Sequence, residues 1–200
     1  MRFFMGLCAM LSVCGFSYAN MGPQGFYAYP NKYFVETGSY VGDGIQKALN
    51  AGFPEIHSLE IDGGSVNHCR HRFRSFTQVH VWHKDSGRQL FEVIENINEP
   101  ITFWLDGHNG RPDPNGGKNT PLLAELDQIK MHSLKNHTIL IDDMHCCATI
   151  LFDYMTQDDI INKVLEINPD YIITFVPGGD AGEYPVNVLV AQPPEIAIKN

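Results

Sequence analysis

Five apolar segments of this chain each end in acidic residues, and this pattern limits the possible folds more than any other feature of the sequence. The segments have the composition of β-strands, and stretches with helical periodicity lie between them. Such alternation predicts a parallel sheet with helices on both faces. The acids at the strand ends are Glu36, Glu60, Asp85, Asp106 and the pair Asp142 and Asp143. We expect them to meet at one edge of the sheet, where folds of this kind bind their ligands.

The last two strand-like segments, residues 171–177 and 186–193, are joined by a Gly-rich loop rather than by a helix. This loop predicts an antiparallel hairpin at one edge of the sheet. The fold class we predict is therefore α/β, with a Rossmann-like, doubly wound and mostly parallel sheet. A chain of 200 residues that is 44% hydrophobic suits a single domain with its own core. We place this domain at residues 32–192, between an irregular lead-in at 20–31 and a tail at 193–200.

The N-terminal segment differs from the rest of the chain. Arg2, the apolar run 3–16, and the small residues Ser17 and Ala19 have the layout of a secretory signal peptide. The apolar run is too short to span a bilayer comfortably. We therefore expect cleavage of residues 1–19 and an exported protein, periplasmic or secreted, without a stable membrane span. A membrane-anchored or cytoplasmic protein is the alternative.

The formal charge of −9 argues against a nucleic-acid partner, because a surface that binds nucleic acid normally needs a basic stripe. An excess of acidic residues suits cation binding and does not exclude a nucleotide-like ligand. After the N-terminal segment the chain carries three cysteines, Cys69, Cys146 and Cys147, and an odd number does not suit a disulfide framework. A bridge from Cys69 to one of the adjacent pair stays open.

The turn after the first strand, ETGSYVGDG, carries Gly38, Gly42 and Gly44. Glycines there let the backbone approach a ligand closely, but their spacing is not the dinucleotide fingerprint, so a pyrophosphate ligand is not expected. Glu60 follows at the end of the next strand, where a carboxylate can accept hydrogen bonds from both hydroxyls of a ribose. Together these features predict a nucleoside-containing cofactor without a phosphate bridge. The alternative is that Glu60 caps the next helix, although Asp62 lies nearer to that position.

In this order and spacing, the segments FVETGSYVGDG, IHSLEID, HKDSG, FWLDGH and ILIDDM resemble the class I S-adenosylmethionine-dependent methyltransferases. They are most similar to small bacterial proteins of this superfamily with E-T-G, W-L-D-G-H and I-D-D strands, and the resemblance covers residues 32–192. It implies S-adenosylmethionine as cofactor. The cofactor-binding residues that it implies are Glu36, Gly38 and Gly42 at the methionine end, Glu60 at the ribose, Asp85 and Ser86 at the adenine, and Asp106 near the amino group and sulfonium.

The resemblance also suggests a metal. Metal-dependent O-methyltransferases of this superfamily bind a divalent cation through an acid after strand four and a pair after strand five, the positions of Asp106, Asp142 and Asp143. Three oxygen ligands suit Mg²⁺ or Ca²⁺ better than zinc. The cation would hold a substrate hydroxyl as an alkoxide. His108 would then be the general base at a catalytic centre shared with Asp106. The alternatives are that the aspartate pair caps the next segment and that His108 is an ordinary loop histidine.

The function implied is an S-adenosylmethionine-dependent methyltransferase that acts on an oxygen of a small-molecule acceptor, with Mg²⁺ as a candidate second cofactor. An export signal conflicts with this function, since S-adenosylmethionine is a cytosolic metabolite. The competing hypothesis is an exported, non-catalytic binding or interaction protein that retains the fold.

Three further features have structural interpretations. Trp82 and Trp104 are predicted to lie in the core against the sheet. The segment TPLLAELDQIKMH predicts a helix with Thr120 as its N-cap and an apolar face that includes Leu126. The Gly/Pro-rich loop 111–118 lies next to the predicted site and is a candidate substrate lid.

Overall fold

The computed structural model of the protein describes residues 25–178 and 184–197. The predicted signal peptide at 1–19 lies outside this part of the chain, as do the first residues of the lead-in and the end of the tail. Residues 25–28 of the lead-in form a short 3-10 helix, η1 (Gly25–Ala28). Across the two described ranges, no helix combines the length and the apolar character needed to cross a membrane.

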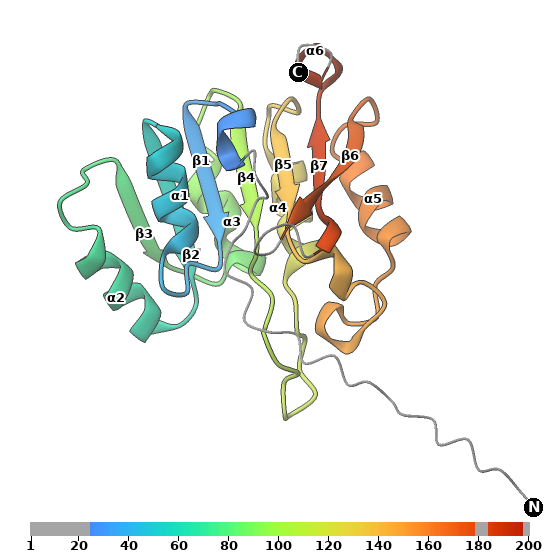
Figure 1. The fold of residues 1–200 in the computed structure, drawn as a ribbon, viewed down its shortest axis with the longest axis horizontal. Helices are drawn as coiled ribbons and strands as arrows, with labels where there is room; N and C mark the ends of the chain where they lie inside the picture. Colours follow the sequence, from blue (N-terminus) through green and yellow to red (C-terminus); the bar gives the residue numbers. More distant parts are fainter. Residues whose placement is uncertain (1–24, 179–183, 198–200) are drawn as a thin grey trace, which may run out of the picture.

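Seven strands of the described residues form one sheet in the order β3-β2-β1-β4-β5-β7-β6 (Figure 1). The strands are β1 (Tyr33–Thr37), β2 (Glu55–Glu60), β3 (Val79–His83), β4 (Ile101–Leu105), β5 (Thr138–Ile141), β6 (Ile172–Gly178) and β7 (Tyr184–Gln192). The first five are parallel, and β7 runs antiparallel to both β5 and β6. The predicted parallel sheet with an antiparallel hairpin is confirmed. The last strand lies inside the sheet, however, and β6 forms the edge.

Helices cover both faces of the sheet (Figure 1). The helices are α1 (Asp43–Ala51), α2 (Gly63–Arg72), α3 (Ser86–Ile94), α4 (Leu122–Met131), α5 (Gln157–Leu165) and α6 (Pro194–Ala197), with short 3-10 turns η2 (Met144–Cys146) and η3 (Ile150–Phe152). Side chains of α1 and α2 pack with η1 on one face, and those of α3, α4 and α5 pack on the other. Because side chains alternate along a strand, β4 supplies Phe103 to one face and Trp104 to the other.

The prediction that Trp82 lies in the core is wrong, whereas Trp104 is fully buried as expected. Trp82 is on β3, which forms the edge of the sheet opposite to β6, and 37% of its surface is exposed. Its indole N–H donates to His57 Nδ1 at 3.2 Å, and the two rings are stacked. The apolar pattern of the strand does not show that it lies at the edge, where the helices leave part of one face to solvent.

Two helix ends show how local sequence sets the element boundaries. Asp62 is the N-cap of α2, and its side chain accepts a hydrogen bond from Ser65 N at 2.8 Å. The predicted cap of α4 is displaced by one residue, since Pro121 is the N-cap and the helix begins at Leu122. Thr120 still accepts a hydrogen bond from Leu122 N at 3.3 Å. Both helices therefore start with an oxygen acceptor near their first free N–H groups.

Cys69 is buried in the core cluster on one face of the sheet, while Cys146 and Cys147 pack on the other face. All three thiols are free. The bridge that the sequence left open is therefore not formed.

A buried pair of histidines connects the amino ends of β4 and β5 to the end of α4. Ile101 N donates to His137 Nδ1 at 3.2 Å, so the proton of the neutral His137 ring lies on Nε2. That nitrogen is 3.1 Å from His132 Nδ1, which also accepts from Leu134 N. His132 Nε2 then donates to Ile97 O at 3.0 Å. Each nitrogen of the two neutral rings has a partner, and the pair joins three segments away from the carboxyl ends of the strands.

Candidate functional site

A cavity of about 490 Å³ lies at the carboxyl ends of the parallel strands, at the edge where the acids were predicted to meet. Its walls come from the ends of β1 and β2, the start of α3, the segment after β4, and the start of α4. The residues that line it are Gly38, Leu59, Glu60, Ile61, Asp85, Ser86, Gly87, Arg88, Gly107, Asn109, Lys118, Asn119, Thr120, Pro121 and Ala124. Its size suits a small molecule or a nucleoside-sized ligand.

Glu60 lines this cavity, and the backbone holds its carboxylate in place. One oxygen accepts from Tyr40 N at 2.9 Å, and the other accepts from Asp62 N at 2.8 Å. Each carboxylate oxygen can accept a further hydrogen bond, so Glu60 remains able to bind a ligand hydroxyl. The side-chain cap of α2 comes from Asp62 instead.

Asp85 and Ser86 line the same cavity at the start of α3, but they differ in what they can offer a ligand. The carboxylate of Asp85 is partly exposed and lies 3.5 Å from Arg88 Nε. The hydroxyl of Ser86 donates to Glu125 Oε1 at 2.5 Å. Asp85 is thus the more available acceptor, while Ser86 contributes to the cavity wall.

Of the three residues predicted at the methionine end, only Gly38 lines the cavity. Glu36 is buried beneath it and accepts a hydrogen bond from the hydroxyl of Ser58, which also bonds to Ser39 at 2.6 Å. Burial raises the pKa of Glu36 well above its usual range, although the bond from Ser58 partly opposes the shift. Gly42 faces away, and a Cβ there would lie 2.5 Å from the ring of Phe73. Glu36 and Gly42 therefore shape the turn from behind.

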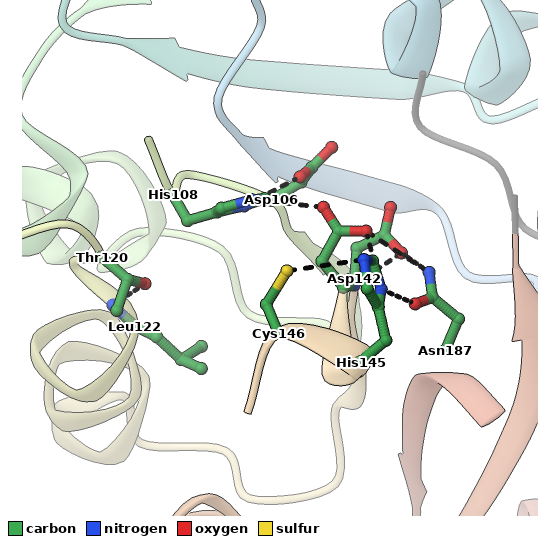
Figure 2. Close-up of polar contacts among 9 residues, drawn as sticks. Asp106, His108, Thr120, Leu122, Asp142, His145, Cys146 and Asn187 are labelled. Atoms are coloured by element: carbon green, nitrogen blue, oxygen red, sulfur yellow. Dashed lines mark hydrogen bonds and ion pairs between the residues drawn. The ribbon is translucent and has the colours of Figure 1, made fainter. Parts of the chain in front are cut away.

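Next to the cavity, Asp106, His108 and Asp143 form a compact cluster, in which Asp143 is buried and the other two residues are partly buried. Figure 2 labels Asp106 and His108. His108 Nδ1 is 3.6 Å from Asp106 Oδ1, and His108 Nε2 is 3.3 Å from Asp143 Oδ2. The histidine ring also packs edge-on against Phe152, with centroids 5.4 Å apart. The structure thus brings Asp106 and Asp143 together as predicted, but with His108 between them.

The charged groups of this cluster affect one another's pKa values. Burial raises the pKa of Asp106 to about 6, an effect partly opposed by its contact with His108. Burial alone would lower the pKa of His108, but its ion pair with Asp106 and the nearby charge of Asp143 outweigh this effect and raise the pKa. The imidazolium form of His108 is therefore stabilised between two carboxylates.

Asp142 has a different environment from Asp143. Its Oδ1 accepts from Asn187 Nδ2 at 2.8 Å and from Asp143 N at 2.8 Å (Figure 2). Burial raises the pKa of Asp142 well above its usual range, and the charge of Asp106 adds to the shift. Asn187 lies on β7 and also reaches Asp143 Oδ1 at 3.4 Å. The aspartate pair is therefore oriented from a neighbouring antiparallel strand.

Two residues of the site were not predicted, although the sequence contains signals for both. Asn187 interrupts an apolar strand, VNVLVA, where a buried polar side chain needs a partner. Glu125 lies on the apolar face of α4, one position from Leu126, and is fully buried. Burial raises the pKa of Glu125 to about 7, and the hydrogen bond from Ser86 partly opposes the shift. A carboxylate on the buried stripe of a helix is unusual enough to mark a site.

The loop predicted as a lid is anchored at its end by Asn119. Asn119 N is 3.0 Å from Asp153 Oδ1, and Asn119 Nδ2 donates to the same oxygen at 2.9 Å and to Ile150 O at 2.9 Å. Asn119 Oδ1 accepts from Asp113 N at 2.7 Å, which closes the loop on itself. Since Lys118 and Asn119 line the cavity, this anchor sets the position of one wall.

We expect the substitution Asp153→Asn to speed tryptic cleavage after Lys118 by about tenfold, because it weakens the charge-assisted hydrogen bonds that hold the loop closed. Asparagine tolerates the left-handed backbone of Asp153, whose φ is +49°, so the fold should persist. The exposed Asp158→Asn substitution on α5 is the matched control and should leave the cleavage rate unchanged. Equal cleavage rates in the two variants would show that Asp153 does not restrain the loop.

The sequence matches no protein-family model and no curated protein. The fold does match solved structures. The N-methyltransferase NodS from Bradyrhizobium japonicum superposes with a TM-score of 0.54 at 11% identity, over 84% of this chain and 89% of that chain. An rRNA methylase from Streptococcus thermophilus gives 0.53 at 11% identity, over 84% and 92%. The fold is that of the class I methyltransferases.

Another structure with the methyltransferase fold is a protein from Staphylococcus aureus assigned as a caffeoyl-CoA O-methyltransferase, with a TM-score of 0.52 at 10% identity over 80% of this chain and 75% of that chain. NodS has also been solved with S-adenosyl-L-homocysteine, and that complex matches at 0.50 and 11% identity over 81% and 78%. Identities this low establish the methyltransferase fold alone. The acceptors of these proteins differ, so the fold does not assign one here.

Proposed function

We propose that this protein is an S-adenosylmethionine-dependent methyltransferase that transfers the methyl group to an oxygen of a small-molecule acceptor. The observation that carries the proposal is the cavity at the strand ends of a methyltransferase fold, in which Gly38, Glu60 and Asp85 come from three successive strand ends. These are the positions at which a nucleoside-containing ligand would need a close backbone approach and two acceptors.

Each lining residue has a role in this proposal. Glu60 accepts hydrogen bonds from the ribose hydroxyls, and Asp85 accepts one from the adenine amino group. The exposed side chain of Ile61 offers apolar surface between these two acids. Gly38 allows the backbone to approach the methionine part, which places the sulfonium towards Asp106. A positively charged cofactor is favoured by the acids that surround this position.

The chemistry follows from the cluster beside the cavity. The acceptor oxygen attacks the methyl carbon, and the carbon–sulfur bond breaks as the carbon–oxygen bond forms. The proton of the acceptor hydroxyl passes to neutral His108, and Asp106 and Asp143 stabilise the imidazolium that results. A divalent cation held by the acids of this cluster would supply an alternative, by lowering the pKa of the acceptor hydroxyl. The sequence-based candidate for that cation is Mg²⁺.

We expect S-adenosylhomocysteine to bind the intact protein in calorimetric titration, and we expect the substitution Glu60→Ala to weaken binding by about 100-fold. Two hydrogen bonds to a carboxylate are each worth about 1.5 kcal/mol or more, which gives a loss of this size. Glu95→Ala, on the exposed end of α3, is the matched control and should bind like the native protein.

No heat of binding at millimolar ligand would overturn the enzyme proposal. Transfer of a labelled methyl group to hydroxyl compounds, but not to amines, would support the O-directed reaction. Under the competing hypothesis of a non-catalytic binding protein, S-adenosylhomocysteine would bind while no acceptor tested would be methylated.

A further inference from the structure

We propose that Asp106, His108 and Asp143 form a binding site for a first-row transition metal ion, with His108 as a ligand. The inference deepens the proposed function, because it replaces a site of oxygen ligands for Mg²⁺ by a mixed nitrogen and oxygen site. It does not depend on cofactor binding, since all three residues belong to this chain and lie beside the cavity.

The three side chains are close enough to bind one ion together. One ligand atom from each of the three residues lies within 4.8 Å of the others. Bonds of about 2.1 Å place two ligands of one ion at most about 4.2 Å apart, so only a small contraction is needed. The three side chains come from the segments after β4 and β5, which the sheet holds side by side.

Burial distinguishes this cluster from a group of surface acids. The side chain of Asp143 is 0% exposed, that of His108 is 8% exposed, and that of Asp106 is 13% exposed. Two buried carboxylates close together repel each other unless a positive charge lies between them. A divalent ion bound between them would supply that charge.

Asp142 supplies an independent observation. It lines a second, small cavity together with Asp106 and His108, and the volume of about 10 Å³ is near that of one water-sized centre. Its side chain is buried, and Oδ2 has no hydrogen-bond partner among the described residues. An unpaired buried carboxylate oxygen is costly, and a water molecule on the ion would satisfy it.

The ligand types select the metal. Imidazole suits iron, nickel, copper and zinc ions, whereas Mg²⁺ and Ca²⁺ prefer oxygen ligands. The two ring nitrogens of His108 face different carboxylates. One ring nitrogen binds the ion beside the two carboxylates, while the other nitrogen keeps the proton of the neutral ring. With an ion bound, His108 would be its ligand and not the base. The ion would lower the pKa of the acceptor hydroxyl, so that its proton could leave to solvent water.

The test is titration of the metal-free, full-length protein with Co²⁺, followed by its visible absorption and by calorimetry. We expect one ion per chain, bound at least 100-fold more tightly than Mg²⁺. The substitution His108→Ala should weaken Co²⁺ binding by at least tenfold and leave the weak Mg²⁺ binding nearly unchanged. His68→Ala, an exposed histidine on α2, is the control for adventitious binding and should behave like the native protein.

The variant Asp143→Asn keeps the inference testable if His108→Ala fails to fold, because asparagine tolerates the left-handed backbone at φ +55°. It should also lose Co²⁺ affinity. Equal affinities for Co²⁺ and Mg²⁺, or native-like Co²⁺ binding by both variants, would overturn the inference. Failure of this inference can be told apart from failure of the proposed function. Co²⁺ binding needs no cofactor, and S-adenosylhomocysteine binding is measured in a separate titration.

Discussion

Replacing Gly38 with alanine is expected to lower the free energy of unfolding by about 3 kcal/mol and to abolish binding of S-adenosylhomocysteine. Gly38 has φ +83°, which L side chains rarely adopt, and a Cβ there would lie 2.4 Å from the backbone oxygen of Asp106. Neither atom can move freely, because the two residues directly follow the paired strands β1 and β4. Relief of the contact would displace Asp106 and the wall of the cavity together.

Gly52→Ala is the matched control for this variant. Gly52 has nearly the same backbone, at φ +85°, but a Cβ there would meet no atom of the described residues within 4 Å. It should cost about 1 kcal/mol from the backbone conformation alone and leave ligand binding unchanged. Denaturant unfolding and calorimetry measure the two effects. Equal losses of stability in Gly38→Ala and Gly52→Ala would show that the contact with Asp106 contributes nothing.

The buried histidine pair is expected to make the protein sensitive to acid. Burial, together with the neighbouring His132, lowers the pKa of His137 to about 3. An unfolded chain would protonate this histidine near pH 6.5, so its contribution to stability is complete above that pH and is lost as the pH falls towards 3. The loss amounts to about 4 kcal/mol in the free energy of unfolding.

The substitution His137→Asn tests this expectation. Asparagine offers an oxygen near the position of Nδ1 for the bond from Ile101 N, but it does not titrate. The variant should be less stable at neutral pH and should lose less stability than the native protein between pH 6.5 and 3. Buried acids such as Glu125 act in the opposite direction, because burial raises their pKa values. The difference between native and variant unfolding curves removes their contribution, since both proteins contain them.

His68→Asn, on the exposed surface of α2, serves as the control for a histidine in contact with solvent. Its unfolding free energy should follow that of the native protein at every pH. Parallel curves for the native protein and His137→Asn would contradict the assignment of the acid sensitivity to His137.

The sequence predicted much of the fold because the signals for strands and helices are local. The segment KYFVETG became β1, and the acids at the ends of β2 and β4 face the predicted edge. Two features escaped prediction for a common reason. The insertion of β7 between β5 and β6, and the exposure of Trp82 on β3, both depend on which strands become neighbours. The hydrophobic pattern of a single strand does not show which distant strands will be its neighbours in the sheet.

Some features of the candidate site could likewise be predicted from the sequence, and others could not. Its location, and the presence of Gly38, Glu60 and Asp85 around one cavity, follow from strand ends in a parallel sheet and were predicted from the residues in order. The burial and the hydrogen-bond partners of each acid could not be predicted from the sequence. Glu36 is buried against Ser58, and Glu125 enters from a helix.

The order of residues along the chain thus establishes an α/β fold with a row of acids at one edge, since backbone periodicity and turn chemistry act over a few residues. The cluster of Asp106, His108 and Asp143, and the support of the aspartate pair by Asn187, arise only when distant segments pack. The physical reason is that side-chain direction, burial and charge coupling depend on neighbours in space. The local sequence of two adjacent aspartates is the same whether they bind a ligand or cap a segment. The surrounding packing decides that Asp143 faces His108 and that Asp142 faces Asn187.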